Sequence, residues 1–109
     1  MSARLAAHVW VSAYLFCLQR AAIPAYVIAR GDATAGAVLV KLARLDGTAQ
    51  AFMRGFDLER ETQVWQELCA GPEADVDAAI SRQRGFDPDL WVIEVEDARG
   101  RHMLDVFAG

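Results

Sequence analysis

The chain has 109 residues, of which 54% are hydrophobic and 24% charged, and its formal net charge is −4. This composition is typical of a globular domain and excludes a disordered chain. Eleven basic against fifteen acidic residues argue against a dedicated nucleic-acid-binding protein, which would carry a basic surplus. The length predicts a single domain, residues 1–109, that buries a core without disulfide or metal support.

The first twenty residues superficially imitate a secretory signal, because an apolar run follows Arg4. His8, Ser12 and Gln19 interrupt or close that run. The run is also shorter than the ~20 residues that a membrane-spanning helix needs. We therefore expect a folded helix in a cytoplasmic protein, with no membrane association.

The two cysteines, Cys17 and Cys69, form no Cys-x-x-Cys motif and have no histidine at ligand spacing. Both lie in apolar stretches, where a free cysteine behaves as a small hydrophobic side chain. We expect two buried thiols, no disulfide, no metal site and no cofactor.

Residues 4–21 are predicted to form a helix that is apolar on most sides. Its polar side chains His8, Ser12 and Gln19 fall on one narrow strip of the helical wheel. A helix of this kind needs cover over most of its surface, which one small domain hardly supplies. We expect the N-terminal helix to bind a protein partner or a second copy of the chain, as in a homo-oligomer.

A strand and a hairpin follow this helix. Pro24 ends the helix, and β-forming residues predict a strand over 25–30. Two apolar runs, 37–45 and 48–53, then flank Asp46-Gly47, the preferred pair of a two-residue type I′ turn. These runs predict a β-hairpin.

The turn type would also fix the register of the hairpin. It would place Lys41 opposite Phe52 and put both on the same face as Arg54. The other face of the hairpin is apolar and would lie on the core. The face with Lys41 and Arg54 would then be at least partly exposed.

The second half of the chain predicts one further helix. Residues 57–70 fit a helix and a strand almost equally, and we favour a strand. Residues 73–84 are predicted to form a helix, because acidic residues lie at the start of this segment and basic residues at its end. The alternation of apolar and polar residues predicts a strand over 91–96, with Trp91 facing the core. A short last strand is predicted near 102–106. The fold expected is α+β, a mostly antiparallel sheet with both helices packed on one face.

Four carboxylates near the C-terminus suggest one alternative function. Asp87, Asp89, Glu94 and Glu96 loosely imitate the acidic pattern of metal-binding nucleases. Glu96 stands where that pattern requires lysine, and the spacing from Asp89 to Glu94 is short. We interpret them as turn and strand-face carboxylates, with a small metal-dependent hydrolase or nuclease as the alternative.

Three cations suggest another alternative. Arg30, Lys41 and Arg54 could bind a phosphate, a carboxylate or a nucleotide. We prefer a structural role, in which Lys41 and Arg54 pair with Glu94 and Glu96 across one sheet face. Phe52 would then lie under the Lys41 stem.

Several segments together carry a family resemblance. They are His8–Leu15, Ile23–Gly31, Ala35–Ala37, Leu45–Thr48 and Arg84–Asp97. They resemble a family of short alphaproteobacterial proteins known as domain of unknown function 1491, most specifically in Phe86–Glu96. The resemblance covers nearly the whole chain except 52–71. It implies a stand-alone cytoplasmic protein and brings no activity and no catalytic residue.

The function therefore stays unknown from the sequence. We expect a small non-enzymatic interaction or accessory module that self-associates, as a homodimer. The metal-dependent enzyme and the anion- or nucleotide-binding domain are the alternatives, and fold class alone does not separate the three.

Overall fold

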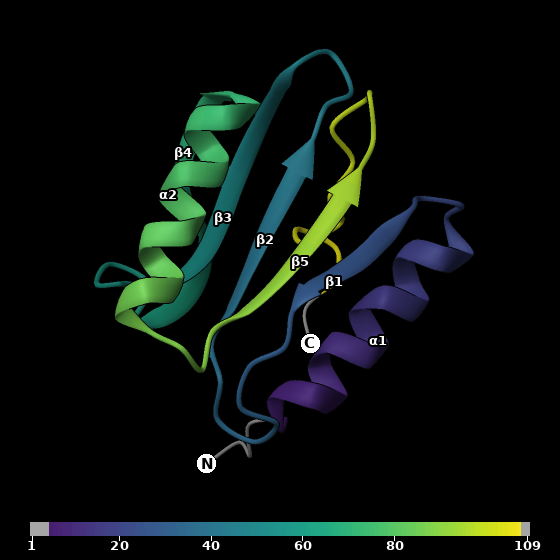
Figure 1. Cartoon of the computed structure of the whole chain (residues 1–109). Helices are drawn as coiled ribbons and strands as arrows, with labels where there is room; N and C mark the ends of the chain where they lie inside the picture. The colour runs from purple at the N-terminus through teal and green to yellow at the C-terminus, as the bar shows by residue number, and fades with distance from the viewer. Residues whose placement is uncertain (1–4, 108–109) are drawn as a thin grey trace.

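The computed structural model describes residues 5–107, which form two helices and a five-stranded sheet (Figure 1). The elements in chain order are α1 (Ala7–Arg20), β1 (Ala25–Ala29), β2 (Val38–Ala43), β3 (Thr48–Asp57), β4 (Thr62–Pro72), α2 (Glu73–Phe86) and β5 (Trp91–Glu96). The start of the predicted first helix and both ends of the predicted domain lie outside the described residues. No helix among the described residues is long and apolar enough to cross a membrane.

The sheet is mixed, with the strand order β1-β5-β2-β3-β4. β2 and β5 run parallel, whereas every other neighbouring pair is antiparallel. A parallel pair needs a crossover connection, which α2 supplies by carrying the chain from the edge strand β4 to the centre of the sheet. The α+β class is confirmed. The sheet is mixed, because the β2–β5 pair is parallel and was not part of the expectation of a mostly antiparallel sheet.

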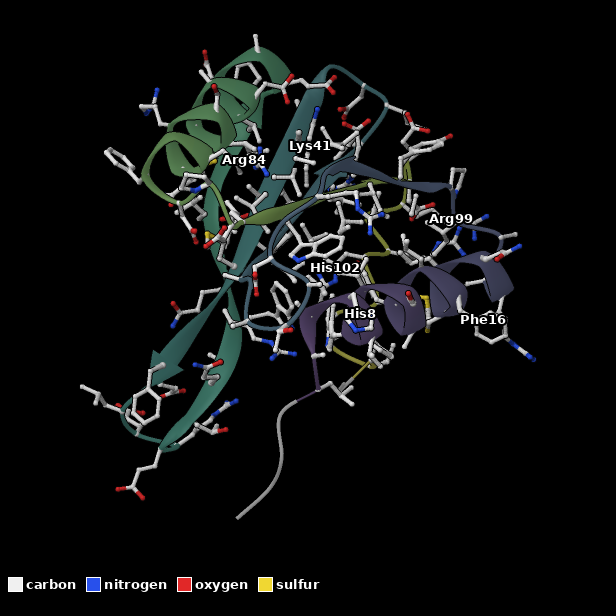
Figure 2. All side chains as sticks on the ribbon, turned by 60° about the horizontal axis from the view of Figure 1, so that its bottom comes forward. His8, Phe16, Lys41, Arg84, Arg99 and His102 are labelled. Atoms are coloured by element: carbon white, nitrogen blue, oxygen red, sulfur yellow. The ribbon has the colours of Figure 1, made fainter. Side chains whose placement is uncertain are left out.

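The two helices pack on opposite faces of the sheet. α1 contributes Trp10, Tyr14 and Leu18 to one core cluster, whose sheet residues include Val40, Leu42, Ile93 and Val95. α2 contributes Val76 and Ile80 to a second cluster, with Leu39, Ala49, Ala51 and Val92. Figure 2 shows α1 and α2 on either side of the strands. The expectation that both helices share one face is wrong, because the central strands are apolar on both faces and need cover on both.

The predicted hairpin forms, but its register differs by one residue. The Arg44 backbone N–H donates to the Thr48 carbonyl, which leaves a three-residue loop containing Asp46. Lys41 consequently lies opposite Ala51 instead of Phe52. A shift of one residue reverses the faces of a strand, so Phe52 and Arg54 lie on the α1 side while Lys41 lies on the α2 side.

The Asp46 carboxylate explains the longer loop. Its Oδ1 accepts hydrogen bonds from the Thr48 backbone N–H and hydroxyl group. The loop holds Leu45 at φ 64° and Gly47 at φ 89°. A three-residue hairpin loop ending with glycine in the left-handed region is the next most common type after two-residue turns.

The remaining elements mostly agree with their predictions. Residues 57–70 belong to the long β3–β4 hairpin, so the favoured strand is confirmed. α2 confirms the helix predicted over 73–84 and extends to Phe86. Trp91 is 2% exposed and faces the α1 core, as predicted. The last strand predicted near 102–106 is wrong, since residues 104–106 form a turn that packs Leu104 into the α1 core.

Candidate functional site

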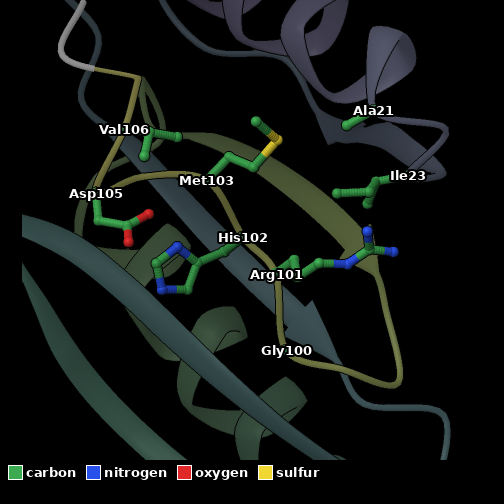
Figure 3. A pocket seen from close by; sticks show the side chains of 8 residues that line it. All are labelled: Ala21, Ile23, Gly100, Arg101, His102, Met103, Asp105 and Val106. Atoms are coloured by element: carbon green, nitrogen blue, oxygen red, sulfur yellow. The ribbon is translucent and has the colours of Figure 1, made fainter.

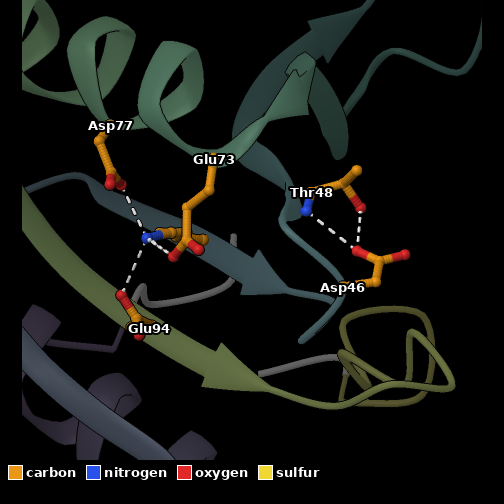
Figure 4. Close-up of polar contacts among 6 residues, drawn as sticks. Asp46, Thr48, Glu73, Asp77 and Glu94 are labelled. Atoms are coloured by element: carbon orange, nitrogen blue, oxygen red, sulfur yellow. Dashed lines mark hydrogen bonds and ion pairs between the residues drawn. The ribbon is translucent and has the colours of Figure 1, made fainter.

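Lys41 is the most unusual charged residue of the fold, because it is only 5% exposed. It points from the centre of β2 toward α2. Its Nζ lies 2.7 Å from Glu73 Oε2, 2.7 Å from Asp77 Oδ1 and 3.2 Å from Glu94 Oε1. Dashed lines in Figure 4 mark these contacts with the three carboxylates. The predicted pairing of Lys41 with Glu94 is therefore confirmed, and α2 adds two carboxylates that the prediction did not include.

These contacts keep Lys41 charged inside the fold. Burial by itself lowers the pKa of Lys41, but hydrogen bonds to Asp77, Glu73 and Glu94 outweigh it and raise the net pKa. A lysine that stays protonated is a poor nucleophile or base. The arrangement suits a structural cation that ties α2 to β2 and β5.

The other acidic residues of the predicted metal site make separate contacts, and the contacts of Asp89 are through its backbone. Asp87 Oδ1 accepts a hydrogen bond from the Asp89 backbone N–H at 3.1 Å, which forms the turn before β5. The Asp89 carbonyl oxygen accepts from the Asp32 backbone N–H. The Glu96 charge is the largest cause that raises the pKa of the Tyr26 hydroxyl, and a hydrogen bond from this hydroxyl to the Glu96 carboxylate adds to the effect. Residues 5–107 contain no group of three or more acidic, His or Cys side chains able to hold a metal ion.

The predicted cations do not gather into one site either. The Arg54 guanidinium lies on the α1 side, 5.4 Å from the Trp10 ring and 5.3 Å from the Trp65 ring. Arg30 lies over the Trp91 ring at 5.2 Å. The predictions that Arg54 shares a sheet face with Lys41, and that Phe52 lies under the Lys41 stem, are wrong because of the hairpin register.

Arg84 is a structural residue, although the sequence marks it only as a basic residue at the end of the helix predicted over 73–84. Its guanidinium donates to three backbone carbonyls, those of Leu90, Pro88 and Arg30, at 3.0, 3.0 and 2.6 Å. It thereby joins the end of α2 to the chain entering β5 and to the end of β1. No local pattern marks this role, since the Arg30 carbonyl is 54 positions away in the sequence.

An aromatic cluster fills the space between α1, β4 and the C-terminal turn. Trp10 stacks on Tyr14 at 4.9 Å and lies 5.4 Å from Trp65, while Phe107 packs on both Trp10 and Tyr14. The Tyr14 hydroxyl donates to the His102 carbonyl at 2.6 Å. Burial raises the pKa of Tyr14, so this hydroxyl remains a donor. The cluster secures the C-terminal segment to α1.

A pocket of about 390 Å³ opens between the end of α1 and this C-terminal segment. Figure 3 shows its lining residues: Ala21, Ile23, Gly100, Arg101, His102, Met103, Asp105 and Val106. The Arg101 guanidinium is held by the Asp97 carboxylate at 3.0 and 3.1 Å, and this contact lowers the Asp97 pKa. The Arg101 charge is therefore engaged within the loop that forms the wall of the pocket.

His102 holds the turn of that loop. Its Nδ1 accepts a hydrogen bond from the Leu104 backbone N–H at 3.0 Å, and its ring lies 4.7 Å from the Phe52 ring. Nδ1 is therefore unprotonated, and Nε2 carries the proton of the neutral ring. Burial lowers the His102 pKa, and the nearby Asp105 charge opposes this only in part.

The lowered pKa predicts a pH-dependent contribution of His102 to stability. The unfolded chain binds the proton more readily, so the contribution is present above about pH 6.5 and is lost as the pH falls through the folded-state pKa. The slope is at most about 1.4 kcal/mol per pH unit. His102→Asn, whose amide oxygen can still accept from Leu104, should flatten the decline that urea unfolding measures between pH 7 and pH 5.

His8 provides the control for this measurement, because it is exposed on α1. His8→Asn should leave the pH dependence of unfolding as it is in the parent chain. An equal pH slope for the parent and for His102→Asn would contradict the assignment.

The outer side of α1 carries apolar side chains that the fold does not cover. Val9 is 41% exposed and Phe16 is 59% exposed, although the opposite side of the helix is buried. Figure 2 shows Phe16 pointing away from the sheet. The Arg20 guanidinium lies 5.9 Å from the Phe16 ring centre. Val9 and Phe16 are therefore apolar side chains that the fold of this chain leaves exposed.

The two cysteines are free thiols, as expected, but both are half-buried instead of fully buried. Cys17 lies on α1 and Cys69 on β4. Burial raises the pKa of the Cys69 thiol, so that thiol is a weak nucleophile.

Comparisons with solved structures agree with this fold. A crystal structure of a DUF1491 family protein from Caulobacter crescentus CB15 matches with a TM-score of 0.82 and 38% identity, over 91% of this chain and 94% of that one. An NMR structure of a DUF1491 family protein from the same organism matches with a TM-score of 0.79 and 37% identity, over 93% of each chain. A solution structure of a protein from A. tumefaciens matches with a TM-score of 0.73 and 28% identity, over 86% of each.

The family comparison gives the same result. Residues 5–105 match the family described as "Protein of unknown function (DUF1491)". No curated protein matches the chain. The resemblance found in the sequence is confirmed, and this chain belongs to the DUF1491 family.

Proposed function

We propose that this chain is a non-enzymatic interaction module of the cytoplasm that self-associates through the outer side of α1. The observation that carries the proposal is the exposure of Val9 and Phe16 on a helix whose other side is fully packed. Exposed apolar side chains on a rigid element favour a protein partner. Free thiols at Cys17 and Cys69 suit a reducing compartment.

The chemistry of this surface supports a protein partner. Aromatic side chains and arginine are enriched among the residues that dominate binding energy in interfaces. Phe16 and Arg20 supply this combination, in contact with each other. The net charge of −4 supports a protein partner over nucleic acid.

The charged residues considered for other functions add support. Lys41 and Glu94 pair with each other, while Asp87 shapes a turn. Arg30 and Arg54 lie over tryptophan rings. Such contacts favour structural roles over a catalytic or anion-binding role for these side chains.

Replacing Phe16 should weaken self-association without unfolding the chain. A symmetric interface contains each residue twice, so we expect Phe16→Ser to raise the dimer dissociation constant at least tenfold, about 1.4 kcal/mol. Sedimentation equilibrium over a micromolar to millimolar range measures the constant. Leu58→Ser is the matched control, since Leu58 is 83% exposed at the tip of the β3–β4 hairpin. A parent chain that stays monomeric throughout would contradict the proposal.

A further inference from the structure

The turn at His102 holds the segment 103–107 against α1. The Leu104 backbone N–H donates to His102 Nδ1 at 3.0 Å. Leu104 is 4% exposed in the α1 core, and the Phe107 ring lies 5.3 Å from the Trp10 ring. One imidazole nitrogen therefore fixes the start of a segment that covers part of the aromatic cluster.

Two features of the packed segment oppose its docking. Met103 has φ 62°, a left-handed conformation that a residue with a Cβ adopts at an energetic cost. The Trp10 Nε1 atom is buried and has no hydrogen-bond partner among the described residues, which also destabilises the arrangement that buries it. Release of the segment removes the strain at Met103 and uncovers the Trp10 ring. The packed state therefore depends on its remaining contacts, and the hydrogen bond to His102 Nδ1 is one that pH can remove.

Protonation of His102 removes the acceptor of this hydrogen bond. The neutral ring accepts at Nδ1, whereas both nitrogens of the charged ring are donors. The Leu104 N–H then faces a second N–H and loses its partner. The Phe52 ring, 4.7 Å from the imidazole ring, offers no acceptor in its place. The charged form of His102 is thus incompatible with the packed turn.

Charged and titratable groups approach His102 from its own loop, from α1 and from the strands. In its own loop, the Asp105 charge raises the His102 pKa but offsets the lowering by burial only in part. Figure 3 shows the Asp105 carboxylate beside the His102 ring. The other groups have contacts of their own: Arg101 with Asp97, Arg44 with the Ala98 carbonyl, Arg54 with the Trp10 and Trp65 rings, Glu67 with Gln50, and Tyr14 with the His102 carbonyl. Mild acidification therefore acts on this turn through His102.

We propose that His102 is the proton-sensitive element of a switch, in which acidification releases residues 103–107 from α1 while the sheet stays folded. The released segment uncovers Trp10 and Tyr14, on which Phe107 packs, and takes away one wall of the pocket at the end of α1. The switch does not depend on self-association through the outer side of α1.

The direction of the switch follows from proton linkage. The released ring has the ordinary histidine pKa of about 6.5, whereas burial lowers the pKa of the packed ring, so the released state binds the proton more readily. The ratio of packed to released chains is therefore constant above about pH 6.5. It falls below that pH by at most about tenfold per pH unit and levels off below the pKa of the packed ring.

Hydrogen exchange tests the switch at single residues. NMR gives protection factors, corrected for the intrinsic pH dependence of exchange, for the Leu104 and Phe107 amides and for the Ile93 amide of β5. At pH 5 the two segment amides should be at least about a hundredfold less protected than Ile93, because they open without the sheet. Between pH 7 and pH 5 their protection should fall at least about fivefold in the parent chain, with the midpoint of the His102 chemical-shift titration.

Two histidine variants identify the group responsible. His102→Asn keeps an acceptor for Leu104 that does not titrate, so the segment amides should change less than about twofold over the same pH range. His8→Asn, at an exposed position of α1, should keep the fall of the parent. Far-UV circular dichroism at both pH values checks that each chain is folded. Segment amides as protected as Ile93 at pH 5, a fall whose midpoint differs from the His102 titration, or an undiminished fall in His102→Asn would each overturn the proposal.

Discussion

Replacing Lys41 with methionine is expected to lower the free energy of unfolding by about 3 kcal/mol. The side chain keeps its approximate length and packing, but the cation that balances Glu73, Asp77 and Glu94 is lost. Removing one partner of a buried ion pair costs about 3–5 kcal/mol, because the other charge stays buried without compensation. The lower end applies here, since the Glu73 and Asp77 side chains are 41% and 54% exposed and can be solvated.

Urea unfolding at pH 7 measures this loss, and a second substitution identifies its cause. Glu94 is the least exposed of the three carboxylates, at 20% of its side chain. Adding Glu94→Gln to Lys41→Met should recover about 1–2 kcal/mol, because the most buried uncompensated charge is removed. Glu94→Gln alone should cost less than about 1 kcal/mol, since Lys41 keeps two partners. A Lys41→Met variant as stable as the parent would show that the cation has no structural role.

The helices and strands could be predicted because their signals are local. The alternation around Trp91 and the charge distribution over 73–84 depend on neighbouring residues alone, and both elements form as expected. Residues 57–70 were ambiguous because short segments satisfy both periodicities. The second part of this segment forms a strand because it pairs with β3. The periodicity of a single segment carries no information about such pairing.

The hairpin register could not be predicted from the turn pair alone. Asp46-Gly47 favours a two-residue turn, but the Asp46 side chain bonds Thr48 and Leu45 adopts a left-handed conformation. The three-residue loop that results places the small Ala51 on the α2 side and Phe52 in the α1 core. Packing on two faces of the sheet therefore outweighs the intrinsic preference of the turn.

The surroundings of Lys41 were predictable only in part, because two of its three partners come from a helix that is distant in the sequence. Glu94 was expected beside Lys41 because both were placed on neighbouring positions of one sheet face, and the parallel pairing of β2 with β5 makes them direct partners. Glu73 and Asp77 come from a helix whose position over the sheet follows from the crossover. A sequence pattern does not specify which sheet face that helix covers, so these two partners were missed.

Trp91→Ala is expected to cost about 3–5 kcal/mol of unfolding free energy. The Trp91 side chain is 2% exposed at the start of β5, an interior strand of the sheet, within the α1 core. Its truncation leaves a cavity in the α1 core, and the cost of such a cavity adds to the lost transfer free energy. The Trp91 Nε1 also donates to the Asp32 carbonyl at 2.7 Å, so the truncation releases the loop between β1 and β2 as well.

Trp91→Phe separates the packing from the hydrogen bond. It keeps an aromatic ring in the core and removes the donor, and it should cost less than Trp91→Ala. Asp32 is exposed, so water can replace the lost donor at its carbonyl. Urea unfolding of both variants, with Phe86→Ala as the control on an 83% exposed aromatic side chain, measures the difference. A Trp91→Ala variant as stable as Phe86→Ala would contradict a core role for Trp91, because loss of a buried ring must cost more than loss of an exposed one.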